Sequence, residues 1–214
     1  MRVDRERVFA AIANERRRIA TLVEGLDDTQ LATPSLCAGW DVKTVAAHLA
    51  CSVADGLPPA MTMALRRGSL NRAIDELARR RAQRPAAEIV ATLRQCADHP
   101  LSPPVIGPVA PFTDILIHGG DISIPLGLPF DPDPESVGLA LDFLTGPWPV
   151  GFVRLGRLRG ISLHGTDIDR SWRKGAEIRG RASALMMAVS GRTALLDKLD
   201  GPGLPVLRQR LLSA

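Results

Sequence analysis

The stretch that decides the fold is WDVKTVAAHL, residues 40–49. Asp41 is a residue type that accepts a backbone N–H at a helix start, and the apolar residues after it recur at the spacing of one helical face. The preceding residues 33–40 hold proline and glycine close together, which predicts an ordered connection in place of a helix. His48 lies beside the apolar stripe of the predicted helix, which is formed by Val42, Val45, Leu49 and Val53.

A second informative stretch is DILIH, residues 114–118. Asp114 and His118 are four positions apart, so on a helix they share one face with Cβ atoms roughly 6 Å apart. Because a buried carboxylate is costly unless it is paired, Asp114 and His118, with His48 from the other helix, are candidate metal ligands. The spacing alone favours a structural Asp–His hydrogen bond equally. Asp121, three residues after His118, either orients this imidazole or caps the helix end, and the spacing leaves both readings open.

Composition excludes several classes of protein. The chain has 214 residues, 45% of them hydrophobic, a net charge of +4 and a pI of 9.5. Its arginines are dispersed and no groove-reading motif accompanies them, so we expect no nucleic-acid partner. No apolar run is long enough to cross a membrane, and the charged N-terminus does not resemble a secretory signal. An odd number of cysteines without C-x-x-C spacing indicates a reduced, cytoplasmic protein.

The periodicity predicts a mainly α fold with two domains, a helical domain over 1–149 and a small α+β domain over 150–214. The residue ranges expected to be helical are 3–26, 42–56, 60–67, 69–84, 86–97, 111–124, 135–144, 182–190 and 193–199. Short strands are expected over 152–155 and 158–163, with another strand or a hairpin around Lys174 and Gly175.

The two stretches carry a resemblance to a known superfamily. Residues 34–49, PSLCAGWDVKTVAAHL, resemble the first motif of the superfamily that joins the DinB-like proteins to the mycothiol-dependent maleylpyruvate isomerases, and residues 114–127 resemble its second motif. Residues 165–172 and 190–203 are similar to the small second domain of the isomerase branch. The resemblance therefore covers almost the whole chain.

This resemblance implies a DinB-like four-helix bundle with a long crossover, in which His48, Asp114 and His118 ligate a divalent ion. Zinc is the usual ion of the family, and nickel suits the same donors. The isomerase branch often has glutamate where this chain has Asp114. Because aspartate is one methylene shorter, either the helices approach more closely here or the metal affinity falls.

Three protein ligands leave one position open, which is the pattern of a catalytic zinc. A thiol in that position becomes a thiolate nucleophile, whereas a water becomes acidic enough for hydrolysis. The resemblance favours mycothiol as the thiol, and therefore a metal-dependent isomerase or thiol S-transferase acting on a small electrophile. A metal-dependent hydrolase and a non-catalytic, ligand-binding or stress-associated protein are the alternatives, and a homodimer stays open.

Four further residues have a functional and a structural interpretation. Cys37 is a candidate thiol near the metal, but a small packed side chain before Trp40 is the favoured reading. Asn71 lines a cavity or begins a helix facing solvent, and we favour the second. His99 and His164 are expected at the surface.

Overall fold

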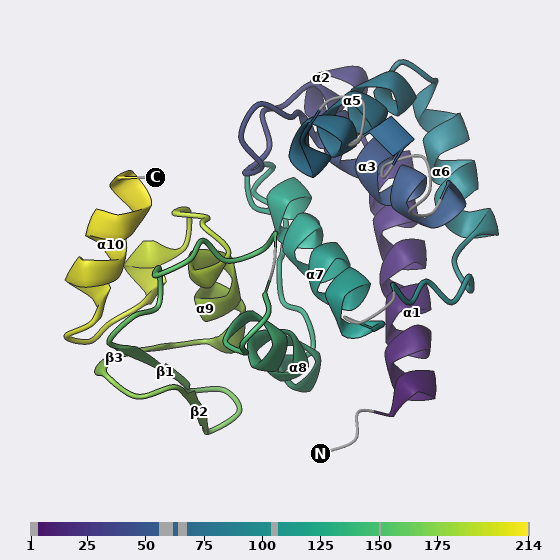
Figure 1. Ribbon diagram of the computed structural model, residues 1–214. Coiled ribbons are helices and arrows are strands. Elements are labelled where there is room, and N and C mark those ends of the chain that lie inside the picture. Colours follow the sequence, from purple (N-terminus) through teal and green to yellow (C-terminus); the bar gives the residue numbers. More distant parts are fainter. Residues whose placement is uncertain (1–3, 56–61, 64–67, 104–106, 150, 214) are drawn as a thin grey trace. The chain divides into compact units, whose positions relative to one another are not determined.

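The computed structural model describes residues 4–55, 62–63, 68–103, 107–149 and 151–213. Contacts divide the chain into two compact units, Met1–Pro129 and Phe130–Ala214. Helices dominate, and a small sheet lies in the second unit, which confirms the predicted fold class (Figure 1). The helix predicted over 60–67 lies largely outside the described residues.

The first unit is a helical bundle. Four helices form its core, because α1 contacts α3, α6 and α7, and α3 contacts both α6 and α7. A fifth helix, α5, packs on α3 and α6, and the predicted long crossover leads from α6 to α7. The helices are α1 (Arg5–Glu24), α2 (Asp28–Leu31), α3 (Val42–Ala54), α5 (Leu70–Ala82), α6 (Ala86–Gln95) and α7 (Val109–Ser123).

Side-chain caps explain where α1, α3 and α5 begin. Asp4, Asp41 and Ser69 each accept a backbone N–H from the first turn of α1, α3 and α5, as their residue types predict. In α7, the nine residues 115–123 are all buried, so this helix is enclosed on every side along that stretch. Within its unit, the helix that carries Asp114 and His118 packs against α1 and α3.

The connection before α3 is ordered by its own hydrogen bonds. Pro34 and Asp41 form an isolated β-bridge, and the backbone N–H of Ser35 donates to the Trp40 carbonyl at 2.9 Å. Gly39 makes the tight turn with φ of +80°, a conformation that side chains disfavour. The N–H of Leu36 donates to the carbonyl of Asp121 at 3.3 Å, which ties this connection to the end of α7.

The second unit packs helices against a small sheet. The sheet has the order β2-β1-β3, with β1 antiparallel to β2 and parallel to β3. Helix α9 is buried along its whole length and contacts α8, β1 and β3, so it forms the centre of the apolar core. The elements are α8 (Pro134–Leu144), β1 (Ile161–Gly165), β2 (Arg170–Trp172), β3 (Ala176–Gly180), α9 (Ala182–Val189), the 3₁₀ helix η1 (Leu196–Lys198) and α10 (Leu204–Leu212).

The units divide at a different place from the predicted domain boundary at 149/150. The contact division lies between Pro129 and Phe130, because α8 packs on α9 and β2. Helix α8 itself forms where predicted. The sequence pattern predicts an apolar face on α8. It does not indicate which of the two units that face belongs to.

The local predictions in this unit are right only in part. Residues 152–155 form turns instead of a strand, because Gly151 and Gly156 adopt positive φ on either side of them. Strands β2 and β3 form on either side of Lys174 and Gly175, which confirms the strand alternative. They do not pair as a hairpin, since β1 lies between them. At Gly175 a Cβ would lie 2.2 Å from backbone atoms of Gly160, so this glycine permits a close approach of two segments. Only Leu196–Lys198 of the helix predicted over 193–199 is helical, and α10 was not predicted.

None of the described helices is both long and apolar enough to span a membrane.

Candidate metal centre

The three predicted ligands lie together in the first unit. His48 comes from α3, while Asp114 and His118 come from successive turns of α7. One donor atom from each residue lies within 4.8 Å of the other two. Oδ2 of Asp114 is 3.2 Å from Nε2 of His48, and Oδ1 is 3.4 Å from Nε2 of His118. The shorter aspartate therefore reaches both imidazoles.

Burial differs among the three side chains. His48 and His118 are buried, whereas the side chain of Asp114 is 26% exposed. Solvent therefore reaches the cluster on the side of the carboxylate.

The charges of the cluster stabilise one another. Burial alone would lower the pKa of His118, but the charge and hydrogen bond of Asp114, together with Asp121, raise it to about 9. Burial alone would likewise raise the pKa of Asp114, but the charges and hydrogen bonds of His118 and His48 hold it well below its usual range. Without a metal, the cluster thus holds an ionised carboxylate beside a protonated His118 at neutral pH.

Asp121 contacts the far nitrogen of His118. Its Oδ2 lies 2.8 Å from Nδ1 of His118, and its side chain is fully buried. When Nδ1 carries the hydrogen and donates it to this carboxylate, the lone pair of Nε2 is directed toward Asp114. The contact supports the orienting interpretation of Asp121 over that of a helix cap.

Trp40 covers the two imidazoles, a role that the sequence analysis missed. The Trp40 ring centroid lies 5.2 Å from that of His48 and 6.1 Å from that of His118. Its Nε1–H donates to Oδ1 of Asp75 on α5 at 2.6 Å. Asp75 in turn accepts from Nε of Arg79 at 2.9 Å, and Arg79 reaches back to the Gly39 carbonyl. No sequence spacing predicts the contact between Asp75 and Trp40. The sequence predicts only the Asp75–Arg79 pair, because these residues are four positions apart on a helix.

The other candidates lie in different surroundings. Cys37 is partly exposed and its sulfur lies within 4.8 Å of donor atoms of His118 and Asp121, so it is closer to the site than the favoured prediction of a packed side chain implied. His99 is exposed in a loop, and His164 on β1 contacts Ser171 Oγ at 3.0 Å. Asn71 is exposed in the first turn of α5, as predicted.

A comparison with protein families finds a match in the first unit. Residues 12–102 match the family described as the mycothiol maleylpyruvate isomerase N-terminal domain. This confirms the resemblance that the motifs predicted. The matched segment includes His48 and ends before Asp114 and His118, so the match itself says nothing of those two residues.

Solved structures with a similar fold extend the likeness of fold to 94% of this chain. A crystal structure of the mycothiol-dependent maleylpyruvate isomerase superposes with a TM-score of 0.55 at 13% identity, covering 94% of this chain and 93% of the other. A histidine mutant of the mycothiol-dependent maleylpyruvate isomerase gives a TM-score of 0.54 with the same coverage. At this identity the likeness shows the fold alone. Among curated proteins, none matches.

Proposed function

We propose that this chain, whose residues 12–102 match the N-terminal domain of the mycothiol maleylpyruvate isomerases, is a metal-dependent enzyme of that type. It would act on a small electrophile with mycothiol as the thiol cosubstrate, either as an isomerase or as a thiol S-transferase. His48, Asp114 and His118 would be the metal ligands, with zinc the preferred ion and nickel the second choice.

The observation that carries the proposal is the convergence of the three donors. Two imidazoles and one carboxylate, brought from two helices, place their donor atoms within 4.8 Å of one another. This donor set is the one that zinc takes in catalytic sites, where the protein supplies three ligands and leaves a position for a small molecule. The residues therefore fit the ion that the family implies.

When bound, the ion would supply the positive charge that lowers the pKa of a thiol and so makes it a thiolate nucleophile at neutral pH. Two neighbouring residues position and cover the proposed ligands. Asp121 holds the ring of His118, and Trp40 shields both imidazoles from solvent. Asp114, the exposed member, borders the side from which thiol and electrophile would enter.

His118 must change its protonation state for this role. With a pKa of about 9 it carries a proton at neutral pH in the metal-free protein, and a ligating imidazole must lose the proton from its donor nitrogen. Metal binding should therefore release a proton near neutral pH. The hydrogen on Nδ1 remains available for Asp121 in both states.

Turnover assays test the proposal. The zinc-loaded protein should convert a maleylpyruvate-type electrophile only when mycothiol is present, and His48→Ala should abolish this turnover. His164→Ala is the matched control, since it removes an imidazole from β1 and should leave turnover unchanged. Equal turnover by wild type and His48→Ala would contradict the proposal.

The thiol requirement separates the alternatives named above. A hydrolase would turn over its substrate without mycothiol and would be unaffected or inhibited by it. A ligand-binding protein would show no turnover in either condition. The cytoplasmic location and a homodimer stay predictions.

A further inference from the structure

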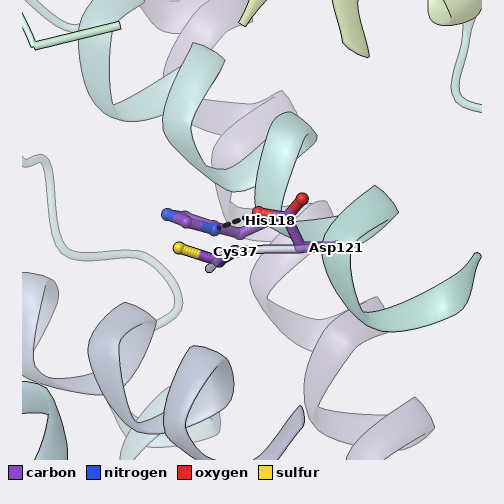
Figure 2. A group of neighbouring side chains, drawn as sticks. All are labelled: Cys37, His118 and Asp121. Carbon is purple, nitrogen blue, oxygen red and sulfur yellow. Dashed lines mark hydrogen bonds and ion pairs between the residues drawn. The ribbon is translucent and has the colours of Figure 1, made fainter. Parts of the chain in front are cut away.

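Beside the predicted ligands lies a second group of donors formed by Cys37, His118 and Asp121. One donor atom of each lies within 4.8 Å of the other two, and the group contains neither His48 nor Asp114. Figure 2 shows the Cys37 thiol next to the His118 ring, with the Asp121 carboxylate bonded to the same ring. We propose that these three residues form a second site, for a thiophilic divalent cation, that shares His118 with the first.

The connection before α3 fixes the position of Cys37. Its backbone N–H donates to Ser35 Oγ at 3.1 Å, and its carbonyl accepts from the N–H of Trp40 at 3.0 Å. The neighbouring N–H of Leu36 donates to the carbonyl of Asp121 itself. The loop that carries the thiol is thus anchored to the residue that supplies the carboxylate, so two of the three donors are held together before any ion binds.

The donor types select the class of ion. A thiolate, an imidazole and a carboxylate together suit zinc and cadmium, whereas magnesium and calcium prefer oxygen donors alone. A thiolate at Cys37 and the carboxylate of Asp121 would also supply two negative charges, which balance a divalent cation. The first group supplies one, from Asp114. Asp121 is fully buried, where a balanced charge matters most.

Sharing His118 has a consequence for the proposed enzyme. The hydrogen bond between Nδ1 of His118 and Asp121 orients this imidazole toward Asp114. An ion held by Cys37, His118 and Asp121 would replace that contact and compete with the first group for the ring. This consequence rests on the proposed function, and it predicts that excess zinc inhibits turnover. The second site itself does not depend on that function.

Cobalt is a probe that distinguishes the second group from the first, because only the second contains a thiol. Metal-free protein is titrated with Co²⁺ and the sulfur-to-cobalt charge-transfer absorption is recorded, because only a thiolate ligand produces it. Wild type should develop this band, and His48→Ala should retain it because the second group lacks His48. Cys37→Ser and His118→Ala should lose it. Cys51→Ser, the matched control on α3, should keep it.

The outcomes distinguish the second site from the proposed function. Cobalt binding by wild type without a thiolate band, or a band that persists in Cys37→Ser, would overturn the second site. Circular dichroism of each variant identifies one that has failed to fold, and Asp121→Asn then replaces Cys37→Ser as the variant expected to lose the band. Failure of the proposed function would instead appear as absent thiol-dependent turnover, whatever the cobalt spectrum.

Discussion

The two units bury different kinds of side chain. Among the described residues, the buried ionisable side chains of Arg, His and Asp all lie in the first unit, and they are Arg16, His48, His118 and Asp121. The buried polar side chains of the second unit are the hydroxyls of Ser183 and Ser190. Its core is apolar, and ion pairs such as Arg179–Asp200 lie at the surface. Burying charge is costly, so the first unit accepts a cost that the second does not.

Within the first unit, the partners separate structural from functional burial. The guanidinium of Arg16 donates to the carbonyls of Cys96, Ala97 and His99, and it thereby fixes the end of α6. His118, by contrast, faces two carboxylates and an aromatic ring, and one of those carboxylates reaches solvent. Buried charge alone does not identify a site. Several donor atoms that converge next to solvent indicate a site.

Replacing His118 with alanine should have the largest effect. It removes a donor from the cluster, so zinc affinity should fall by at least about 100-fold, the upper range for losing an outer partner of a metal ligand. Thiol-dependent turnover should fall below detection. Zinc affinity is measured by competition with a chromogenic chelator, with His99→Ala as the exposed control. Unchanged zinc affinity in His118→Ala would mean that the buried charged side chains of the first unit do not form a metal site.

Replacing Leu185 with alanine probes the other side of the comparison. Leu185 is fully buried in α9, so the cavity should lower the free energy of unfolding by about 2–5 kcal/mol. Denaturant titration measures this, with the more exposed Val206→Ala expected to change it by less than about 0.5 kcal/mol. Zinc affinity per folded molecule should not change. A loss of affinity in Leu185→Ala would show that the metal centre depends on the core of the second unit.

The stability of the metal-free protein should depend on pH. The pKa of His118 is raised from 6.5 to about 9 in the folded state, so its contribution is fully present below pH 6.5 and is lost as the pH rises through 9. The free energy of unfolding should therefore fall between these values. Denaturant titrations across this range measure the slope, which His118→Gln should reduce. If the free energy of unfolding of His118→Gln falls with pH as steeply as that of the wild type, other titratable groups cause the pH dependence.

Replacing Asp75 with asparagine should have the smallest effect of the set. The hydrogen bond from Trp40 and the nearby Arg79 hold the pKa of Asp75 below its usual range, so the carboxylate is ionised and bonded at neutral pH. The neutral amide weakens both bonds, which should cost about 1 kcal/mol and reduce zinc affinity only a few-fold. Glu76→Gln, beside it on α5, is the control. An Asp75→Asn effect as large as that of His118→Ala would make Trp40 part of the binding machinery.

The sequence predicted the helical unit well because local signals specify it. Asp41 and Ser69 cap their helices, and the apolar stripes that follow have the helical period. The four-residue spacing of Asp114 and His118 likewise fixes their common face without any tertiary information. His48 joined them through the family motif, and no spacing in the chain connects it to α7.

What escaped prediction depends on contacts between distant segments. The strand order places β1 between β2 and β3, so that these two strands, which are neighbours in the sequence, do not pair with each other. Cys37 lies 81 residues before His118, and its placement follows from the Leu36–Asp121 hydrogen bond. Asp75 supports Trp40 in the same way. Such pairings carry no periodic signature.

The most direct test of the central claim is a zinc-edge anomalous diffraction map of crystals grown with one equivalent of zinc. We expect a peak bounded by Nε2 of His48, Nε2 of His118 and the carboxylate of Asp114, and no such peak in crystals of His48→Ala. Zinc found only elsewhere in the wild-type protein, with these three side chains still bonded to one another, would contradict it.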